Sequence, residues 1–182
     1  MSTPSRLVQN SGHLISLVMI MLMVGSSAGL GATSPRLGTQ LTPTDVAALD
    51  ISIFPDGRGL PPGRGTAIEG RAIYDAQCAS CHGAGGRGAT AEELVGRGPL
   101  IGPNPDKTIG SYWPYTTTIF DMTKRSMPMS APGSLTDDQV YAVTAYLLFA
   151  NAIISEAFEI NQLSLPQVAM PNREGFDRIE AK

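Results

Sequence analysis

Two cysteines and a histidine stand close together near the middle of the chain, in the order Cys78, Ala79, Ser80, Cys81, His82. Two thiols three positions apart at the end of a helix lie on one side of the chain, so both reach the two vinyl groups of one porphyrin. The next residue, His82, is then carried beneath the iron, where its imidazole nitrogen serves as a ligand. The spacing therefore predicts one haem c, bound covalently through Cys78 and Cys81, with His82 as the proximal axial ligand.

Other chemistry of the same residues fits the chain less well. A structural zinc ion needs four ligands, and the chain has no other cysteine and only one other histidine, His13, which lies in the leader described below. A redox-active dithiol of the thioredoxin kind expects a βαβ unit, which the sequence does not show, whereas a disulfide is the ordinary fate of paired cysteines in an oxidising compartment. The complete five-residue motif favours haem over both.

The second axial position needs another kind of ligand, because no histidine remains for it. The methionines after the leader are Met122, Met127, Met129 and Met170. Met127 and Met170 are each followed by proline, which holds the chain extended and removes a competing N–H at the ligand. Met127 lies in a turn-rich segment, 124–134, between the attachment site and the last helix, which is the shorter route to the iron. We predict Met127 as the second iron ligand, with Met129 and Met170 as alternatives.

Two further segments are candidates for contacts with the haem. A carbonyl of the turn around Pro99 is predicted to accept the other ring N–H of His82, although Pro99 also reads as an ordinary turn proline. Tyr112 and Trp113 lie in an aromatic segment that includes the only tryptophan of the chain. Aromatic side chains with polar tips are suited to wall a haem and donate to its propionates, and plain core or partner contacts are the alternative.

Two helices and a long loop are expected to position these residues. Apolar residues at helical spacing over 66–77 lead into Cys78, and the glycine-rich stretch 83–105 reads as a loop. Thr136 with Gln139 three positions later forms a capping box, and apolar residues on one helical face follow as far as Ile154. The sequence therefore predicts a compact unit over residues 66–154, too small to be stable without a staple such as a cofactor.

The flanking segments read as a leader and two arms. Residues 1–28 have the charged start, the apolar run Leu14 to Val24 and the small-residue exit of a secretory signal, so we expect export to the periplasm. If the leader is not cleaved, it is a membrane anchor that leaves the domain facing the periplasm. Residues 29–65 form an arm rich in proline and glycine, and residues 155–182 form an extended polar tail.

The composition narrows the class of protein. The chain has 182 residues, a formal net charge of −3, 42% hydrophobic residues and 16% charged residues. These values are typical of a globular protein and argue against a basic groove for nucleic acid.

The chain resembles the class I cytochromes c over about residues 66–154. Gly70 and Tyr74 look like the glycine and aromatic pair with which the first helix of that family crosses the last, where Tyr146 would be the aromatic partner. The resemblance implies an all-α fold of helices and loops wrapped around one covalent haem.

A narrower likeness extends over roughly residues 45–182, to the monohaem cytochrome subunits of sulfur-compound dehydrogenases. It is carried by the sequences DGRGLPPG (56–63), GSYWPY (110–115), MP (127–128), LTDDQVYAV (135–143) and MPNR (170–173). This family includes the cytochrome partners of the molybdenum sulfite dehydrogenases and of the Sox sulfane dehydrogenase, the latter a longer, two-part chain. The resemblance implies that a molybdenum subunit oxidises the sulfur compound and passes electrons singly to this chain.

Ligation by His82 and Met127 would fill both axial positions, which predicts electron transfer and no enzymatic activity of the chain by itself. The alternatives are a free-standing carrier between a respiratory complex and a terminal oxidase, and a haem enzyme with a displaceable sixth ligand. For an electron-transfer protein, a downstream cytochrome or oxidase is the expected acceptor. Lys124 and Arg125 beside Met127 are candidates for a docking rim, although charges next to a loop are more often simply solvated.

Overall fold

The computed structural model describes residues 38–177, apart from the side chains of residues 47 and 48. Residues Thr42–Lys182 form one compact unit, and the preceding unit, Met1–Leu41, is described only at residues 38–41. The predicted leader, 1–28, lies outside the described residues. Within the described part, every helix is too short or too polar to cross a membrane.

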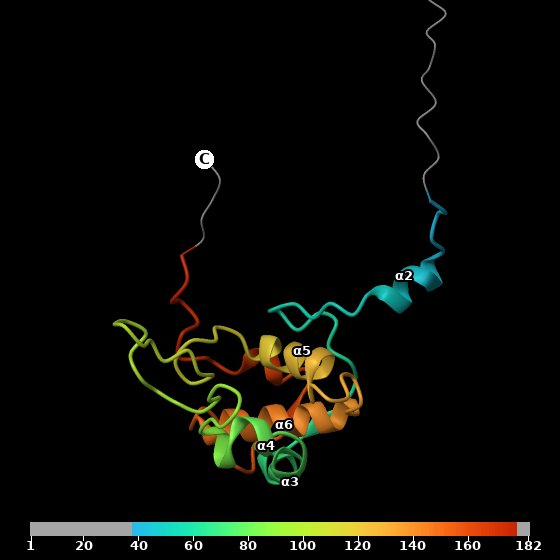
Figure 1. Cartoon of the computed structure of the whole chain (residues 1–182). Coiled ribbons are helices and arrows are strands. Elements are labelled where there is room, and N and C mark those ends of the chain that lie inside the picture. The colour runs from blue at the N-terminus through green and yellow to red at the C-terminus, as the bar shows by residue number, and fades with distance from the viewer. Residues whose placement is uncertain (1–37, 178–182) are drawn as a thin grey trace, which may run out of the picture. The chain divides into compact units, whose positions relative to one another are not determined.

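Helices and loops make up nearly all of this unit (Figure 1), and its described residues include one very short strand pair. The elements are α2 (Pro43–Leu49), β1 (Arg64–Gly65), α3 (Ala67–Gln77), α4 (Ala79–His82), the 3₁₀ turn η1 (Ala84–Gly86), α5 (Thr116–Ser126), α6 (Asp137–Ala150), β2 (Ile160–Asn161) and the 3₁₀ turn η2 (Leu165–Gln167).

The ends of α3 and α6 follow from their local sequence. Each helix is preceded by a threonine that forms a capping box with the residue three positions later: Thr66 with Glu69, and Thr136 with Gln139. In each pair, the threonine hydroxyl accepts from the N–H of the later residue, and the side chain of the later residue accepts from the threonine N–H. Helix α6 ends at Ala150, earlier than the predicted Ile154. Residues Val140 to Leu148 are all buried, so α6 is the central helix of the fold.

The crossing of α3 and α6 confirms the role predicted for Gly70. A Cβ atom at Gly70 would lie 1.8 Å from the carbonyl oxygen of Ala142, so only glycine permits this approach of the two backbones. Beside the crossing, the rings of Tyr74 and Tyr146 pack with their centroids 5.0 Å apart. Figure 1 shows α6 between α3 and α5, consistent with its contacts to both.

Helix α5 was not expected from the sequence. Its run of three threonines has low helix propensity, and no side chain caps its N-terminus. Burial of Ile119, Phe120 and Thr123 against the rest of the core stabilises it instead. Because α5 continues to Ser126, the turn that we expected to begin at Lys124 begins at Met127.

The two flanking segments pack on the domain itself. Strands β1 and β2 pair antiparallel, and Ile160, Leu165 and Met170 belong to the buried core. The carbonyl of Leu165 accepts from the Thr116 hydroxyl at 2.6 Å. In the N-terminal flanking segment, the carbonyl of Pro61 accepts from the Tyr141 hydroxyl at 2.9 Å. The predicted tail therefore contributes core residues as far as Met170, despite its polar composition.

Candidate functional site

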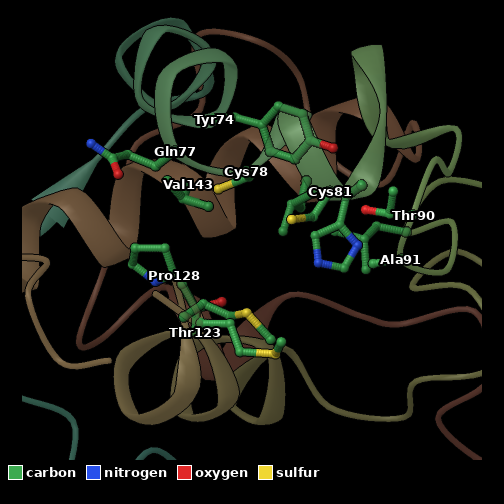
Figure 2. Close-up of a pocket in the computed structure, with 14 residues that line it drawn as sticks. Tyr74, Gln77, Cys78, Cys81, Thr90, Ala91, Thr123, Pro128 and Val143 are labelled. Carbon is green, nitrogen blue, oxygen red and sulfur yellow. The ribbon is translucent and has the colours of Figure 1, made fainter. Parts of the chain in front are cut away.

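The cysteine and histidine motif forms one short turn of helix directly after α3. Cys78 caps the C-terminus of α3, and its carbonyl accepts from the N–H groups of Cys81 at 3.1 Å and His82 at 2.9 Å. Both cysteines border the same hollow, and they form no disulfide with each other. Figure 2 shows their sulfur atoms on one side of the open space, with Thr123 and Pro128 on the other. The structure therefore brings both thiols to one wall of a cleft.

The cleft consists of two adjoining hollows, each partly open to solvent. Five residues border both hollows, namely His82, Leu94, Thr123, Met127 and Leu147. Mainly apolar atoms form the walls. The ionisable side chains in the wall of the first hollow are those of Tyr74, Cys78, Cys81 and His82. A predominantly apolar cleft bordered by a few aimed polar groups is the usual form of a cofactor site.

His82 is oriented by a main-chain carbonyl. Its Nδ1 atom lies 2.8 Å from the carbonyl oxygen of Glu92, which requires a proton on Nδ1 and leaves Nε2 free as a ligand. The prediction that the turn around Pro99 supplies this acceptor is wrong. The carbonyl of Pro99 instead accepts from the N–H of Asp106, and Pro99 itself is exposed.

The loop after His82 explains why Glu92 takes this role. The N–H of Gly88 donates to the carbonyl of His82, and the N–H of Ala91 donates to that of Cys81, both at 2.8 Å. These bonds fold the loop back onto α4 and bring the Glu92 carbonyl to the imidazole. Gly83 makes the turn possible, because its φ of +76° is left-handed and a Cβ there would lie 2.3 Å from the Gly88 carbonyl oxygen.

Among the methionines after the leader, Met127 alone borders both hollows. It follows the last residue of α5, where the chain becomes extended. Met122 and Met129 each border a single hollow and are 47% and 80% exposed. Met170 is 4% exposed within the core and borders neither hollow. The position of Met127 favours it over the alternatives as a ligand, and the ligation itself stays a prediction.

The two aromatic candidates separate in the structure. Trp113 borders the second hollow. Tyr112 borders neither hollow and packs edge to face on Phe176, with ring centroids 5.2 Å apart. The Tyr112 carbonyl also accepts from the side-chain amide of Asn172 at 2.7 Å. Tyr112 therefore holds the C-terminal segment, while Trp113 is placed to contact a group in the cleft.

Sequence reasoning missed several residues of the cleft. Its lining includes Leu94, Thr123 and Leu147. No sequence pattern distinguishes these three from other residues of a helix or loop. Glu92 acts through its main chain, which carries no signal of residue type. Tyr74 was expected only at the helix crossing, yet its hydroxyl also donates to the carbonyl of Gly83 at 2.9 Å, directly behind His82.

The environment affects the two thiols unequally. Burial, with a smaller contribution from the neighbouring Cys81, raises the pKa of the Cys78 thiol to about 11. Cys78 therefore stays protonated at neutral pH in the free protein, unlike the acidic thiols of reactive redox dithiols.

The charges proposed as a docking rim are compensated. Lys124 forms an ion pair with Asp137, and Arg125 forms one with Asp121. Each of these two positive charges is therefore paired with a carboxylate, and exposed pairs of this kind contribute little to stability.

The donor set fits a covalently bound haem. Two thiols, an imidazole with a free nitrogen and a thioether all border one largely apolar cleft. Thiols form the thioether links, and imidazole and thioether are the axial ligands found in cytochromes c. Nothing among these residues conflicts with a porphyrin in this position.

Comparisons with known proteins identify related chains. The family model described as "Cytochrome C oxidase, cbb3-type, subunit III" matches residues 65–147. A thiosulfate dehydrogenase of Allochromatium vinosum is 34% identical over 138 residues, which are 74% of this chain and 44% of that protein. The chain thus matches less than half the length of this curated relative.

A solved structure is also similar over most of the chain. It is the crystal structure of the sulfane dehydrogenase SoxCD from Paracoccus pantotrophus, with 41% sequence identity and a TM-score of 0.73. The match covers 79% of this chain and 71% of that chain, so it reaches well beyond residues 65–147.

Proposed function

Because this chain belongs to the cytochrome c family and carries one covalently bound haem c, we propose that Cys78 and Cys81 hold the haem through thioether bonds and His82 binds its iron. The support is the shared wall of the two thiols and the orientation of His82 by the Glu92 carbonyl. This hydrogen bond fixes the ring and increases the basicity of the ligating nitrogen.

Met127 is the second iron ligand in this proposal. It borders both hollows and is held at the end of α5. When bound, the haem supplies a one-electron iron couple whose potential a methionine ligand raises. With His82 and Met127 in place, the chain leaves no position for a substrate at the iron, and the mainly apolar walls limit its contact with water. Its residues thus favour outer-sphere electron transfer.

The electron donor in this proposal is a molybdenum-containing sulfur-compound dehydrogenase. The observation that carries it is the 41% identity to the SoxCD sulfane dehydrogenase structure over 79% of the chain. Because this match extends beyond the haem domain, it includes flanking segments that a simple carrier would not need. The partner oxidises the sulfur compound, and this chain receives the electrons one at a time and passes them to a downstream cytochrome or oxidase.

Export to the periplasm completes the proposal. Haem attachment to a CxxCH motif and the leader-like residues 1–28 both support it. A retained leader would keep the same domain at the periplasmic face of the membrane.

The partner is tested with protein purified from its own cells under mild conditions. We expect a molybdenum-containing subunit to co-purify and the haem to be reduced when sulfite or thiosulfate is added. If dithionite reduces the haem but neither sulfur compound does, and a quinol-oxidising complex reduces it instead, the chain is a free-standing carrier.

A second candidate function is a haem enzyme that oxidises thiosulfate itself. It is favoured by the 34% identity to a thiosulfate dehydrogenase. This function needs an open or displaceable position at the iron, so it conflicts with stable ligation by Met127. Thiosulfate oxidation by the isolated chain, with ferricyanide as acceptor and no other protein present, would establish it and reject the role of a simple acceptor.

A further inference from the structure

Asn151, the residue that follows α6, joins that helix to the loop behind His82. Its side chain is buried, with 3% of the residue exposed, and all of its hydrogen-bonding groups are used. The Oδ1 atom accepts from the N–H of Gly96 at 3.1 Å. The Nδ2 atom donates to the carbonyls of Leu94 at 3.2 Å and Leu147 at 2.9 Å. One amide side chain thus fixes two positions of the loop to the end of the central helix.

The loop that Asn151 holds is the one that carries the Glu92 carbonyl. Leu94 lies two residues after Glu92, and the N–H groups of Leu94 and Val95 both donate to the carbonyl of Gly86, at 2.8 and 3.0 Å. These bonds close residues 86–95 into one hydrogen-bonded unit. Because Glu92 lies within that unit, holding Leu94 in place also holds the Glu92 carbonyl 2.8 Å from Nδ1 of His82.

The surroundings of Asn151 are shaped for this contact. The hydroxyl of Thr108 donates to the carbonyl of Gly96 at 2.9 Å, which secures the same loop from its other side. A Cβ atom at Gly110 would lie 2.5 Å from Oδ1 of Asn151 and 2.2 Å from the carbonyl oxygen of Gly96. The absence of a side chain at Gly110 therefore lets the loop approach Asn151.

We propose that Asn151 is a positioning residue for the axial histidine: by holding Leu94 and Gly96, it keeps the Glu92 carbonyl in its hydrogen bond with His82. This inference rests on the proposed ligation of iron by His82. Residues behind a ligating histidine fix its ring orientation and increase its basicity. Asn151 reaches the ligand through one loop, so its loss is expected to loosen that hydrogen bond more than the rest of the fold.

The test measures hydrogen exchange of the His82 Nδ1 proton by NMR in the reduced holoprotein. Asn151→Leu removes both the donor and the acceptor at similar size. We expect its His82 Nδ1 proton to exchange roughly tenfold faster than in the unmodified protein, the scale of one lost hydrogen bond. Asn151→Asp keeps an acceptor for Gly96 and loses the donor to Leu94, so we expect a smaller acceleration, and this milder variant serves if the leucine variant fails to fold.

Thr144→Val is the matched control. Thr144 is fully buried on α6, and its hydroxyl donates only to Val140 within that helix, at 2.7 Å. This variant loses one buried hydrogen bond and leaves the loop unchanged. We therefore expect the ratio of the exchange rate of the His82 Nδ1 proton to that of the α6 amides to stay as in the unmodified protein. The exchange rate of the His82 Nδ1 proton is compared with that of the α6 amides in each variant. If this ratio rises no more in Asn151→Leu and Asn151→Asp than in Thr144→Val, the proposal is wrong.

Failure of the underlying ligation shows separately, in the unmodified protein. The ring protons of a ligated His82 are shifted far upfield by the porphyrin above them. Ring protons at ordinary positions in that spectrum overturn the ligation by His82, whatever the variants do.

Discussion

Met127 and His82 occupy different kinds of position around the cleft. His82 is oriented by a hydrogen bond to Glu92, whereas Met127 is placed by the end of a helix and the proline that follows it. The two side chains therefore differ in how strongly the protein constrains them. Because Met127 is held only by its backbone, we expect that substituting it removes the ligand with the least effect on the rest of the site.

We expect Met127→Ala to remove the sulfur-to-iron absorption band while the haem stays covalently bound. The reduction potential should fall by a sizeable part of the roughly 0.8 V range that axial ligands span. Met129→Ala is the control, because Met129 borders the same hollow but is 80% exposed. Visible spectra and potentiometry check both variants. Persistence of the band in Met127→Ala, or its loss in Met129→Ala, contradicts the assignment.

Asp106 holds together the outer part of the same loop region. Its carboxylate accepts from the N–H groups of Gly98 and Thr108 and from the hydroxyl of Ser111. Burial raises the pKa of this carboxyl, but the hydrogen bonds outweigh burial and hold the pKa below its usual value of 3.8. Because the folded-state pKa is depressed, Asp106 stabilises the fold fully above that value and ceases to do so as the pH falls through the folded-state pKa.

We therefore predict that Asp106→Asn lowers the free energy of unfolding by about 1 kcal/mol at neutral pH. The difference from the unmodified protein should shrink as the pH falls below 3.8, the usual carboxyl value. Denaturant unfolding of the two holoproteins between neutral and acid pH gives this difference directly. A difference that is constant with pH would show that the charge of Asp106 does not contribute.

At the level of helices and segments, the C-terminal segment is part of the core. Leu165 is fully buried and its carbonyl is tied to α5 through Thr116, while Leu163, two residues earlier, is 75% exposed. The two leucines therefore provide a matched pair within one segment.

Leu165→Ala is expected to lower the free energy of unfolding by about 2–5 kcal/mol, the cost of a cavity in a packed core. Leu163→Ala should change it by less than about 0.5 kcal/mol. Thermal unfolding of the holoproteins distinguishes the two. Equal effects would mean that the segment does not pack on the domain as described.

The sequence predicted those elements whose determinants are local. The CxxCH turn, the capping box of α6 and the need for glycine at Gly70 each depend on a few residues at fixed spacing, and the structure agrees with all three. The all-α fold was implied by the resemblance to the class I cytochromes c, and the structure agrees with it.

What the sequence did not predict depends on contacts between distant segments. Helix α5 has weak propensity and is stabilised by burial, and Leu165 and Met170 join the core from an otherwise polar segment. The acceptor for His82 was assigned to the wrong turn, because main-chain carbonyls carry no signal of residue type. The separation of Tyr112 from Trp113 likewise depends on where Phe176 packs.

For the molecule as a whole, the haem cleft lies where α3, α5, α6 and the loop after α4 meet. Its two hollows are bordered by mainly apolar side chains such as Leu94, Trp113 and Met127, which the protein itself buries only in part, so without the cofactor these walls would face water. The bound group is thus expected to contribute a large share of the stability.

We predict that the double variant Cys78→Ala, Cys81→Ala, produced without haem, is largely unfolded at ambient temperature. The amide spectrum in NMR checks this, with the unmodified holoprotein as the folded reference. A well-dispersed amide spectrum of the haem-free double variant would show that the fold does not depend on the cofactor.

The most direct test of covalent attachment is the mass of one proteolytic peptide. Trypsin cleavage after Arg71 and Arg87 releases residues 72–87, which contain both cysteines and His82. From cells with the haem-maturation machinery, this peptide should carry the added mass of one haem, retained in acidified acetone. The same peptide with two free thiols or a disulfide, and no haem, would contradict the account.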